Sequence, residues 1–151
     1  MASKGLQTGI QIALWVVIFG LGYALYYSIT KPYEAIERAA ELTEMTRERM
    51  DNLRTVLINY ENQYDRYPST LDSLLMYANG DSTFLSIRDS ILTGVVMDSL
   101  VYSPRDGRKP FTYANNDTTK VRTYLLEDPD SDDSIGTLAS DITLVNAASW
   151  E

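Results

Sequence analysis

The most apolar segment of the chain lies near its beginning, where Ile10 to Ile29 form a nearly uninterrupted hydrophobic run. Roughly 20 such residues are what an α-helix needs to cross the hydrocarbon core of a membrane. The run is longer than the apolar part of a secretory signal peptide, and no small-residue cleavage site follows it. We therefore expect a retained transmembrane helix over residues 10–30, preceded by a short N-terminus of residues 1–9.

Beyond this run, apolar residues recur at helical spacing among charged ones from Ile36 to Tyr64. The pattern predicts an amphipathic helix over residues 31–67. Lys31-Pro32 is expected to kink or restart that helix at the membrane surface, because proline lacks an N–H. The apolar stripe is too irregular for strict heptads, so we expect it to pack on the protein's own sheet rather than on a partner helix.

The stretch "YENQYDRYPSTLDSLL" interrupts the helical pattern at Tyr67-Pro68. Proline disfavours the α conformation in the preceding residue, so the long helix should end near Asp65 to Arg66. Ser69 or Thr70 can cap a short second helix. That helix should run to Ala78, before Asn79-Gly80, and "STFLSIRDSIL" predicts one or two further helical turns.

Three short segments then alternate apolar and polar residues and are separated by turn-forming sequences. They are Ser99 to Ser103, Pro110 to Ala114 and Val121 to Glu127, and they predict an antiparallel meander. The apolar face of such a sheet needs a cover, which the long helix can provide. The expected fold class is α+β, with residues 68–151 forming a helical loop, a small antiparallel sheet and an acidic C-terminal region.

The composition of the chain excludes several classes of partner and of functional site. The chain of 151 residues has a net charge of −8, which argues against a partner with a phosphate backbone, so nucleic acid is not expected. It contains no cysteine and no histidine, which excludes disulfides, thiolate metal sites and the commonest general base. Neither an enzymatic activity nor a small-molecule substrate is indicated, and the eleven tyrosines are read as core and interface residues.

Charges near the span predict its orientation. Lys4 and the α-amine outweigh the mixed charges that follow the span, so the N-terminus should be cytoplasmic and the rest of the chain periplasmic, in a bacterial inner membrane. Within the span, small and aromatic residues could contact lipid, a pigment or the helices of other integral subunits. These helix-docking candidates are Trp15, Phe19, Gly20, Gly22 and Ala24.

The loop "EDPDSDDSIG" gathers four carboxylates, Asp128, Asp130, Asp132 and Asp133, which could offer oxygen ligands to calcium. It does not have the spacing of an EF-hand, since Asp133 stands where that motif needs glycine and Ala139 where it needs glutamate. A solvated turn is the alternative. Calcium is the only cofactor for which the residues offer candidate ligands.

Several of these segments together resemble the periplasmic domain of the major pseudopilins of type II secretion. The resemblance covers roughly Glu41 to Trp150 and rests on a helix-end motif and a Pro-aromatic-x-aromatic strand. It implies a pseudopilin-like fold and, in the acidic loop, calcium. The matching residues are Tyr64, Arg66, Tyr67 and Pro68 in the first motif, with Asp65 where glycine is usual, and Pro110, Phe111 and Tyr113 in the second.

The N-terminal segment departs from that family. Pseudopilins are cut by a prepilin peptidase after a glycine that is followed by Phe-Thr-x-x-Glu, and the glutamate helps to register subunits in the filament. Here Gly5 is followed by "LQTGI", with Ile10 at the glutamate position. The chain is therefore predicted to be a non-enzymatic accessory or structural subunit of a larger membrane complex, photosynthetic or respiratory assemblies being candidates. A divergent pseudopilin of a type II secretion or type IV pilus system is the alternative.

Overall fold

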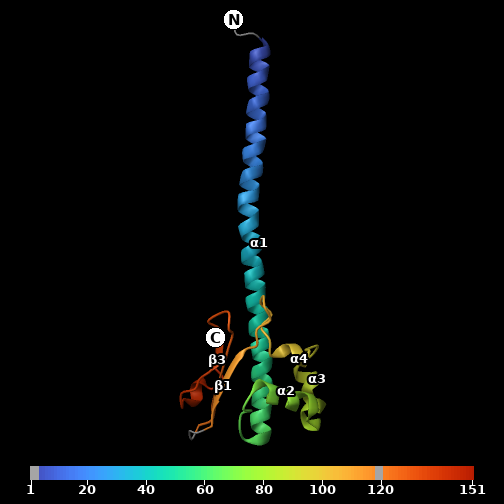
Figure 1. Ribbon diagram of the computed structural model, residues 1–151, viewed down its shortest axis with the longest axis vertical. Helices are drawn as coiled ribbons and strands as arrows, with labels where there is room; N and C mark the ends of the chain where they lie inside the picture. The colour runs from blue at the N-terminus through green and yellow to red at the C-terminus, as the bar shows by residue number, and fades with distance from the viewer. Residues whose placement is uncertain (1–3, 118–120) are drawn as a thin grey trace. The chain divides into compact units, whose positions relative to one another are not determined.

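A computed structural model describes residues 4–117 and 121–151 of the chain. The chain divides at Glu41 and Leu42 into two compact units, Met1–Glu41 and Leu42–Glu151, each described over those residues. The first unit is helical, and the second is α+β (Figure 1). One helix, α1 (Lys4–Tyr64), runs through both units. It is the one helix of the described residues that is long and apolar enough to cross a membrane, and none of its most apolar 18-residue window is buried.

The kink expected at Lys31-Pro32 is absent, because α1 is helical without interruption through both residues. Proline removes one backbone donor, but its fixed φ near −65° is compatible with a helix. One turn earlier the Thr30 hydroxyl donates a hydrogen bond to the carbonyl oxygen of Tyr26 at 2.8 Å. The predicted end of the helix is correct, since α1 ends at Tyr64.

Two short helices follow, and both are capped as their sequences dictate. Thr70 accepts a hydrogen bond from the backbone N–H of Ser73 at the start of α2 (Leu71–Gly80). Asp81 caps α3 (Ser82–Ile91) by accepting from Thr83 and Phe84. The helical reading of both segments is confirmed, although each helix is slightly longer than expected.

The first predicted strand, Ser99 to Ser103, is wrong. Its beginning belongs to α4 (Met97–Leu100), and only Tyr102 makes a bridge, to Pro110. The reason lies in the spacing of the buried side chains: Met97, Leu100 and Val101 lie three and four residues apart, as on one helix face. A segment of five residues is too short to distinguish the two-residue period of a strand from the 3.6-residue period of a helix.

The sheet has three antiparallel strands in the order β1 (Thr112–Asn116), β2 (Thr123–Glu127) and β3 (Ser134–Gly136). Tyr113 pairs with Leu126, which pairs in turn with Ile135. A meander was predicted, but its third strand is β3, which the sequence reading assigned to the acidic loop. Gly136 has φ of 87°, and a Cβ there would overlap the carbonyl oxygen of Tyr124, so this strand end requires glycine. The chain continues into η1 (Ile142–Leu144), a short 3-10 helix.

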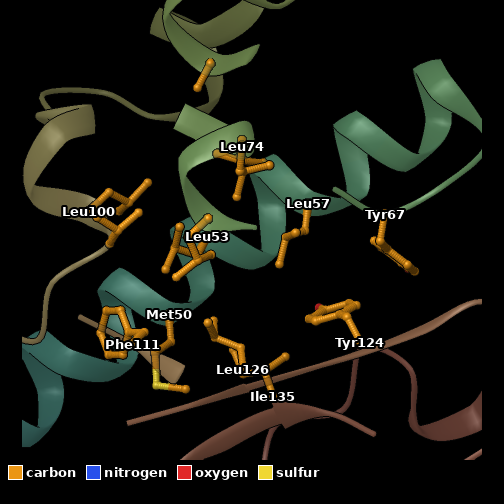
Figure 2. Close-up of a cluster of buried hydrophobic side chains, with 14 of the residues drawn as sticks. Met50, Leu53, Leu57, Tyr67, Leu74, Leu100, Phe111, Tyr124, Leu126 and Ile135 are labelled. Carbon is orange, nitrogen blue, oxygen red and sulfur yellow. The ribbon is translucent and has the colours of Figure 1, made fainter. Parts of the chain in front are cut away.

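In the second unit α1 lies between the sheet and the short helices (Figure 1). Its buried residues Met50, Leu53 and Leu57 recur on one helix face. Figure 2 shows them between Leu74 and Leu100 on one side and residues of the sheet on the other. The sheet side of this core is formed by Phe111, Tyr124, Leu126 and Ile135. The expectation that the long helix covers the sheet is confirmed for this part of α1.

The same expectation is wrong for the beginning of the stripe. Ile36 is 66% exposed and Ala40 is exposed, Leu42 and Thr43 are half-buried, and full burial begins only at Thr46 and Met50. The fully buried residues of α1 lie between Thr46 and Leu57, whereas Ile36 and Ala40, nearer the N-terminus, are exposed.

Candidate functional site

The two motifs of the predicted resemblance lie together at the end of α1. The Tyr113 hydroxyl donates a hydrogen bond of 2.8 Å to the carbonyl oxygen of Pro68. Tyr67 is only 5% exposed and its ring lies 4.8 Å from that of Tyr124, centroid to centroid. Phe111 is buried in the same core. The helix end and the sheet are thus joined through aromatic residues of both motifs.

Asp65 explains how this chain differs from the family pattern at the helix end. Its φ is 56°, in the left-handed region where glycine is favoured and which aspartate tolerates better than most residues. Its carboxylate accepts two hydrogen bonds from the Arg122 guanidinium, at 2.6 and 2.9 Å. These hydrogen bonds hold the pKa of Asp65 below its usual range. The aspartate therefore adopts the turn that glycine would make and adds a contact to the residue just before β2.

Burial raises the pKa of several tyrosines in this region, because a phenolate loses solvation inside the core. The pKa of Tyr67 rises to about 12, and those of Tyr113 and Tyr124 rise further. Groups that stay neutral throughout the physiological range are suited to packing and hydrogen bonding rather than to proton transfer. The reading of these tyrosines as core residues agrees with this environment.

A second aromatic group connects α1 to α2 and α3. The rings of Tyr60 and Tyr64 lie 4.7 Å apart, and both meet Tyr77 edge to face. Tyr77 in turn contacts Phe84 at 5.0 Å. The Tyr64 hydroxyl donates to Asp81, the N-cap of α3, so this group fixes where α3 begins.

Arg66, the remaining residue of the first motif, lies on the surface. It lines a polar cavity of about 260 Å³ with Tyr60, Ser69, Ser73 and Asp117. Pro110, the first residue of the second motif, bridges to Tyr102 at the edge of the fold. Neither residue takes part in the aromatic contacts that join the motifs.

Three of the four aspartates of the acidic loop pair with different cationic residues. Asp128 has a fully buried side chain whose Oδ2 lies 3.0 Å from Arg105 Nε, and Asp133 pairs with Arg47 at 2.9 Å. Asp130 forms an ion pair with Lys109. Asp132 is exposed and has no polar partner in the described part of the chain.

These ion pairs bear directly on the calcium prediction. Within residues 4–117 and 121–151, no group of three or more acidic side chains is placed to hold a metal ion. The Oδ1 atom of Asp128 is nevertheless buried without a hydrogen-bond partner. Calcium at this loop stays a prediction, and the geometry supports an ion-paired loop in preference to the solvated turn.

Sequence reasoning missed the arginines of α1 that hold the C-terminal segment. Arg54 donates to the carbonyl oxygen of Asn146 at 2.9 Å and to the Glu151 carboxylate at 3.0 Å. The hydrogen bond from Arg54 lowers the pKa of Glu151, while burial raises that of Asp51 on the same helix. Arg47 lies over the Trp150 ring at 5.2 Å. These partners are about 90 to 100 residues apart, so no local spacing could have indicated them.

The docking candidates in the span are all on an exposed helix surface, but they do not form one face. Trp15 and Phe19 stack with centroids 5.8 Å apart, and Gly22 follows one turn later on their side. Gly20 and Ala24 share another side, because residues two apart on an α-helix are rotated by about 200°. The docking candidates are therefore distributed over two sides of the helix, and their contact with other helices stays a prediction. A Cβ at Gly20 or Gly22 would meet nothing within 4 Å, so both sides are open to a neighbour.

Comparison of the chain with family models, with curated proteins and with solved structures finds no match.

Proposed function

We propose that this protein is a non-enzymatic, single-pass accessory or structural subunit of a larger membrane complex, anchored by the N-terminal part of α1. One observation carries the proposal: residues 10–29 of the span are all exposed, while Met50, Leu53 and Leu57 of the same helix belong to the core of a packed α+β unit. An exposed run of this length has no stable place in water, and a bilayer or other apolar helices would cover it. The proposed anchor is thus joined to a packed domain.

The chemistry of the second unit supports a packing role. Its central acidic residues, Asp128 and Asp133, are occupied by arginines, and the buried tyrosines stay neutral. The chain has no histidine or cysteine to serve as a base or nucleophile. An extramembrane domain of this kind is suited to packing against partner proteins, in photosynthetic, respiratory or other membrane assemblies.

The test is purification from the native membrane in mild detergent, followed by mass spectrometry of the intact N-terminus and of the proteins that co-purify. We expect other integral subunits in fixed stoichiometry, and an N-terminus at Met1 or Ala2. Gly20→Leu or Ala24→Leu should lower the recovery of those partners, because a large side chain prevents close approach of helices. Gly20→Ala keeps the residue small and is the matched control, for which recovery should be unchanged.

The proposal includes a bacterial inner membrane with the N-terminus in the cytoplasm and the second unit in the periplasm. It rests on the excess of positive charge before the span. Protease added to intact spheroplasts should remove the chain beyond about Lys31. Protection of the acidic domain in intact spheroplasts would contradict this orientation.

The divergent pseudopilin remains the second candidate, and the contact between Tyr113 and Pro68 favours it, since it joins two motifs typical of that family. The left-handed turn at Asp65, where that family has glycine, points the same way. The segment after Gly5 argues against it, because the processing signal and register glutamate of the family are missing. Recovery of a chain beginning at Leu6 together with secretion or pilus components would establish this alternative and overturn the first.

A further inference from the structure

The exposed apolar face of the first unit continues beyond the predicted span. Tyr33 is 68% exposed and Ile36 is 66% exposed, and Ala40 lies one turn further on the same side. The residues between them are mostly charged, with Glu34 and Arg38 among them. Three apolar residues aligned on a charged helix are not needed to cross a membrane, and a helix bathed in water would gain from covering them.

The spacing of these residues extends a pattern from inside the span. From Ile12 to Ala40, apolar residues occur at alternating spacings of three and four residues. This spacing is a seven-residue repeat with apolar residues at its a and d positions. Inside the span almost all neighbouring residues are apolar as well, so the repeat is informative mainly where Tyr33, Ile36 and Ala40 continue it. The residues on the repeat are Ile12, Trp15, Phe19, Gly22, Tyr26, Ile29, Tyr33, Ile36 and Ala40.

We propose that this stripe is the seam of a parallel, in-register dimer with a second copy of the same chain. A repeat of seven residues matches a partner helix that follows the same supercoil, whereas lipid imposes no such period. A second copy inserted through the same membrane has the same orientation and carries the same repeat at the same height. Gly22 on the seam lets two helices approach closely at that level.

The charges beside the stripe agree with a second copy as the occupant. One edge carries Glu37 and Glu44, and the opposite edge has the uncharged residues Pro32 and Ala39 at the corresponding positions. In a parallel dimer opposite edges of the two helices face each other, so no like charges meet across the seam. The stripe ends at Ala40, shortly before the part of α1 that is buried within the second unit, where Thr46 is fully buried.

This inference rests on the proposed membrane anchorage and adds a partner to it. The seam uses the side of the helix with Trp15, Phe19 and Gly22, so the side with Gly20 and Ala24 stays available for other subunits. Two copies could therefore enter a larger complex as a pair.

The absence of cysteine from the chain permits a direct test by disulfide cross-linking of single-cysteine variants of the full-length protein in its native membranes. Ala40→Cys lies on the stripe, and Ala35→Cys is its matched control, since both residues are exposed alanines of the same helix. A disulfide requires Cα atoms within about 7 Å of each other, which is met at a seam and not on its outer side. Oxidation should give several-fold more disulfide-linked dimer with Ala40→Cys than with Ala35→Cys.

Ile36→Cys should also cross-link, and Arg38→Cys should not, which checks the period independently of the first pair. Equal cross-linking at all four positions would reveal random collision and overturn the proposal. So would the absence of a dimer, or cross-linking of Ala40→Cys to a different protein. Carbonate extraction of the same membranes tests the anchorage separately from the dimer. A variant that stays in the membrane without cross-linking contradicts only the dimer. A chain released by carbonate contradicts the anchorage.

Discussion

Asp65 and Arg122 form a two-point ion pair, with oxygen–nitrogen distances of 2.6 and 2.9 Å, between the end of α1 and the start of β2. Asp65 does so from a left-handed backbone conformation, with φ of 56°. One residue thus serves both the turn that ends the helix and the attachment of that turn to the sheet. The two contributions can be separated by substitution.

Asp65→Ala should lower the melting temperature of the full chain in detergent, by roughly a few degrees relative to Asp65→Gly. Alanine loses the ion pair and is also strained at a positive φ, whereas glycine loses only the ion pair. Thermal unfolding followed by near-ultraviolet circular dichroism measures the difference. If Asp65→Gly melted lower than Asp65→Ala, backbone strain could not be the reason for aspartate at this position.

The stability contributed by the Asp65–Arg122 ion pair should depend on pH in the acidic range. The pKa of Asp65 in the folded protein lies below its ordinary value of 3.8, so its contribution is complete above that pH and is lost as the pH falls further. Arg122→Gln should therefore reduce the melting temperature at neutral pH, and its effect should shrink as the pH falls further below 3.8. A reduction of equal size at both pH values would contradict this assignment.

Tyr113→Phe should destabilise the second unit by about 1 kcal/mol, because the partly buried carbonyl of Pro68 loses its hydrogen bond. The ring itself is kept, so the aromatic packing should be unaffected. Tyr102→Phe is the matched control, since no hydrogen bond of its hydroxyl is present in the described structure and the change should be close to neutral. Denaturant unfolding of both variants gives the comparison, and equal losses would show that the Pro68 contact is unimportant.

Local signals in the sequence predicted the elements that depend on neighbouring residues. Pro68 ends α1 and Thr70 caps α2, and each effect acts within a few residues. The strand Ser134–Gly136 was missed because it has only three residues and lies in a segment dominated by aspartate and serine. Its pairing with β2 is a tertiary contact that no local pattern encodes.

The candidate site was predictable in part for the same reason. The four aspartates of the acidic loop could be identified as a group, but their partners Arg47 and Arg105 lie elsewhere in the chain. An aspartate-rich loop that binds calcium and one whose aspartates pair with arginines can have the same local sequence. Only the fold distinguishes them.

Asp128→Asn should be among the most damaging single substitutions, with a loss of about 3 kcal/mol, because it leaves Arg105 beside a buried site without its counter-charge. Asp132→Asn is the control in the same loop, as its side chain is exposed and its removal should change stability by less than about 0.5 kcal/mol. Denaturant unfolding curves for the two variants test the contrast. Similar losses would mean that the loop acts as a unit rather than through the Arg105 pair.

An ion-paired loop and a calcium site predict different responses to calcium. If the ion pairs of Asp128, Asp130 and Asp133 occupy the loop, calcium should leave the melting temperature unchanged. A ligand that binds only the folded state would raise the melting temperature by mass action. Melting curves in millimolar calcium and in chelator make the test. A rise that Asp130→Asn or Asp132→Asn abolishes would establish the calcium site predicted from the sequence.

Alkaline pH should unfold the second unit through its buried tyrosines. The pKa of Tyr67 and that of Tyr77 each lie at about 12, raised from an ordinary value of 10.0 mainly by burial. The folded state therefore holds these protons more tightly than the unfolded state, so the stabilisation is complete below pH 10 and is lost as the pH rises toward 12. We expect the phenolate absorbance of these residues to appear together with the loss of near-ultraviolet circular dichroism. Tyr67→Phe should move this transition to higher pH, because one phenol that favours the unfolded state at alkaline pH is gone. If Tyr67 and Tyr77 ionised near pH 10 while the folded signal persisted, their burial in the core would be contradicted.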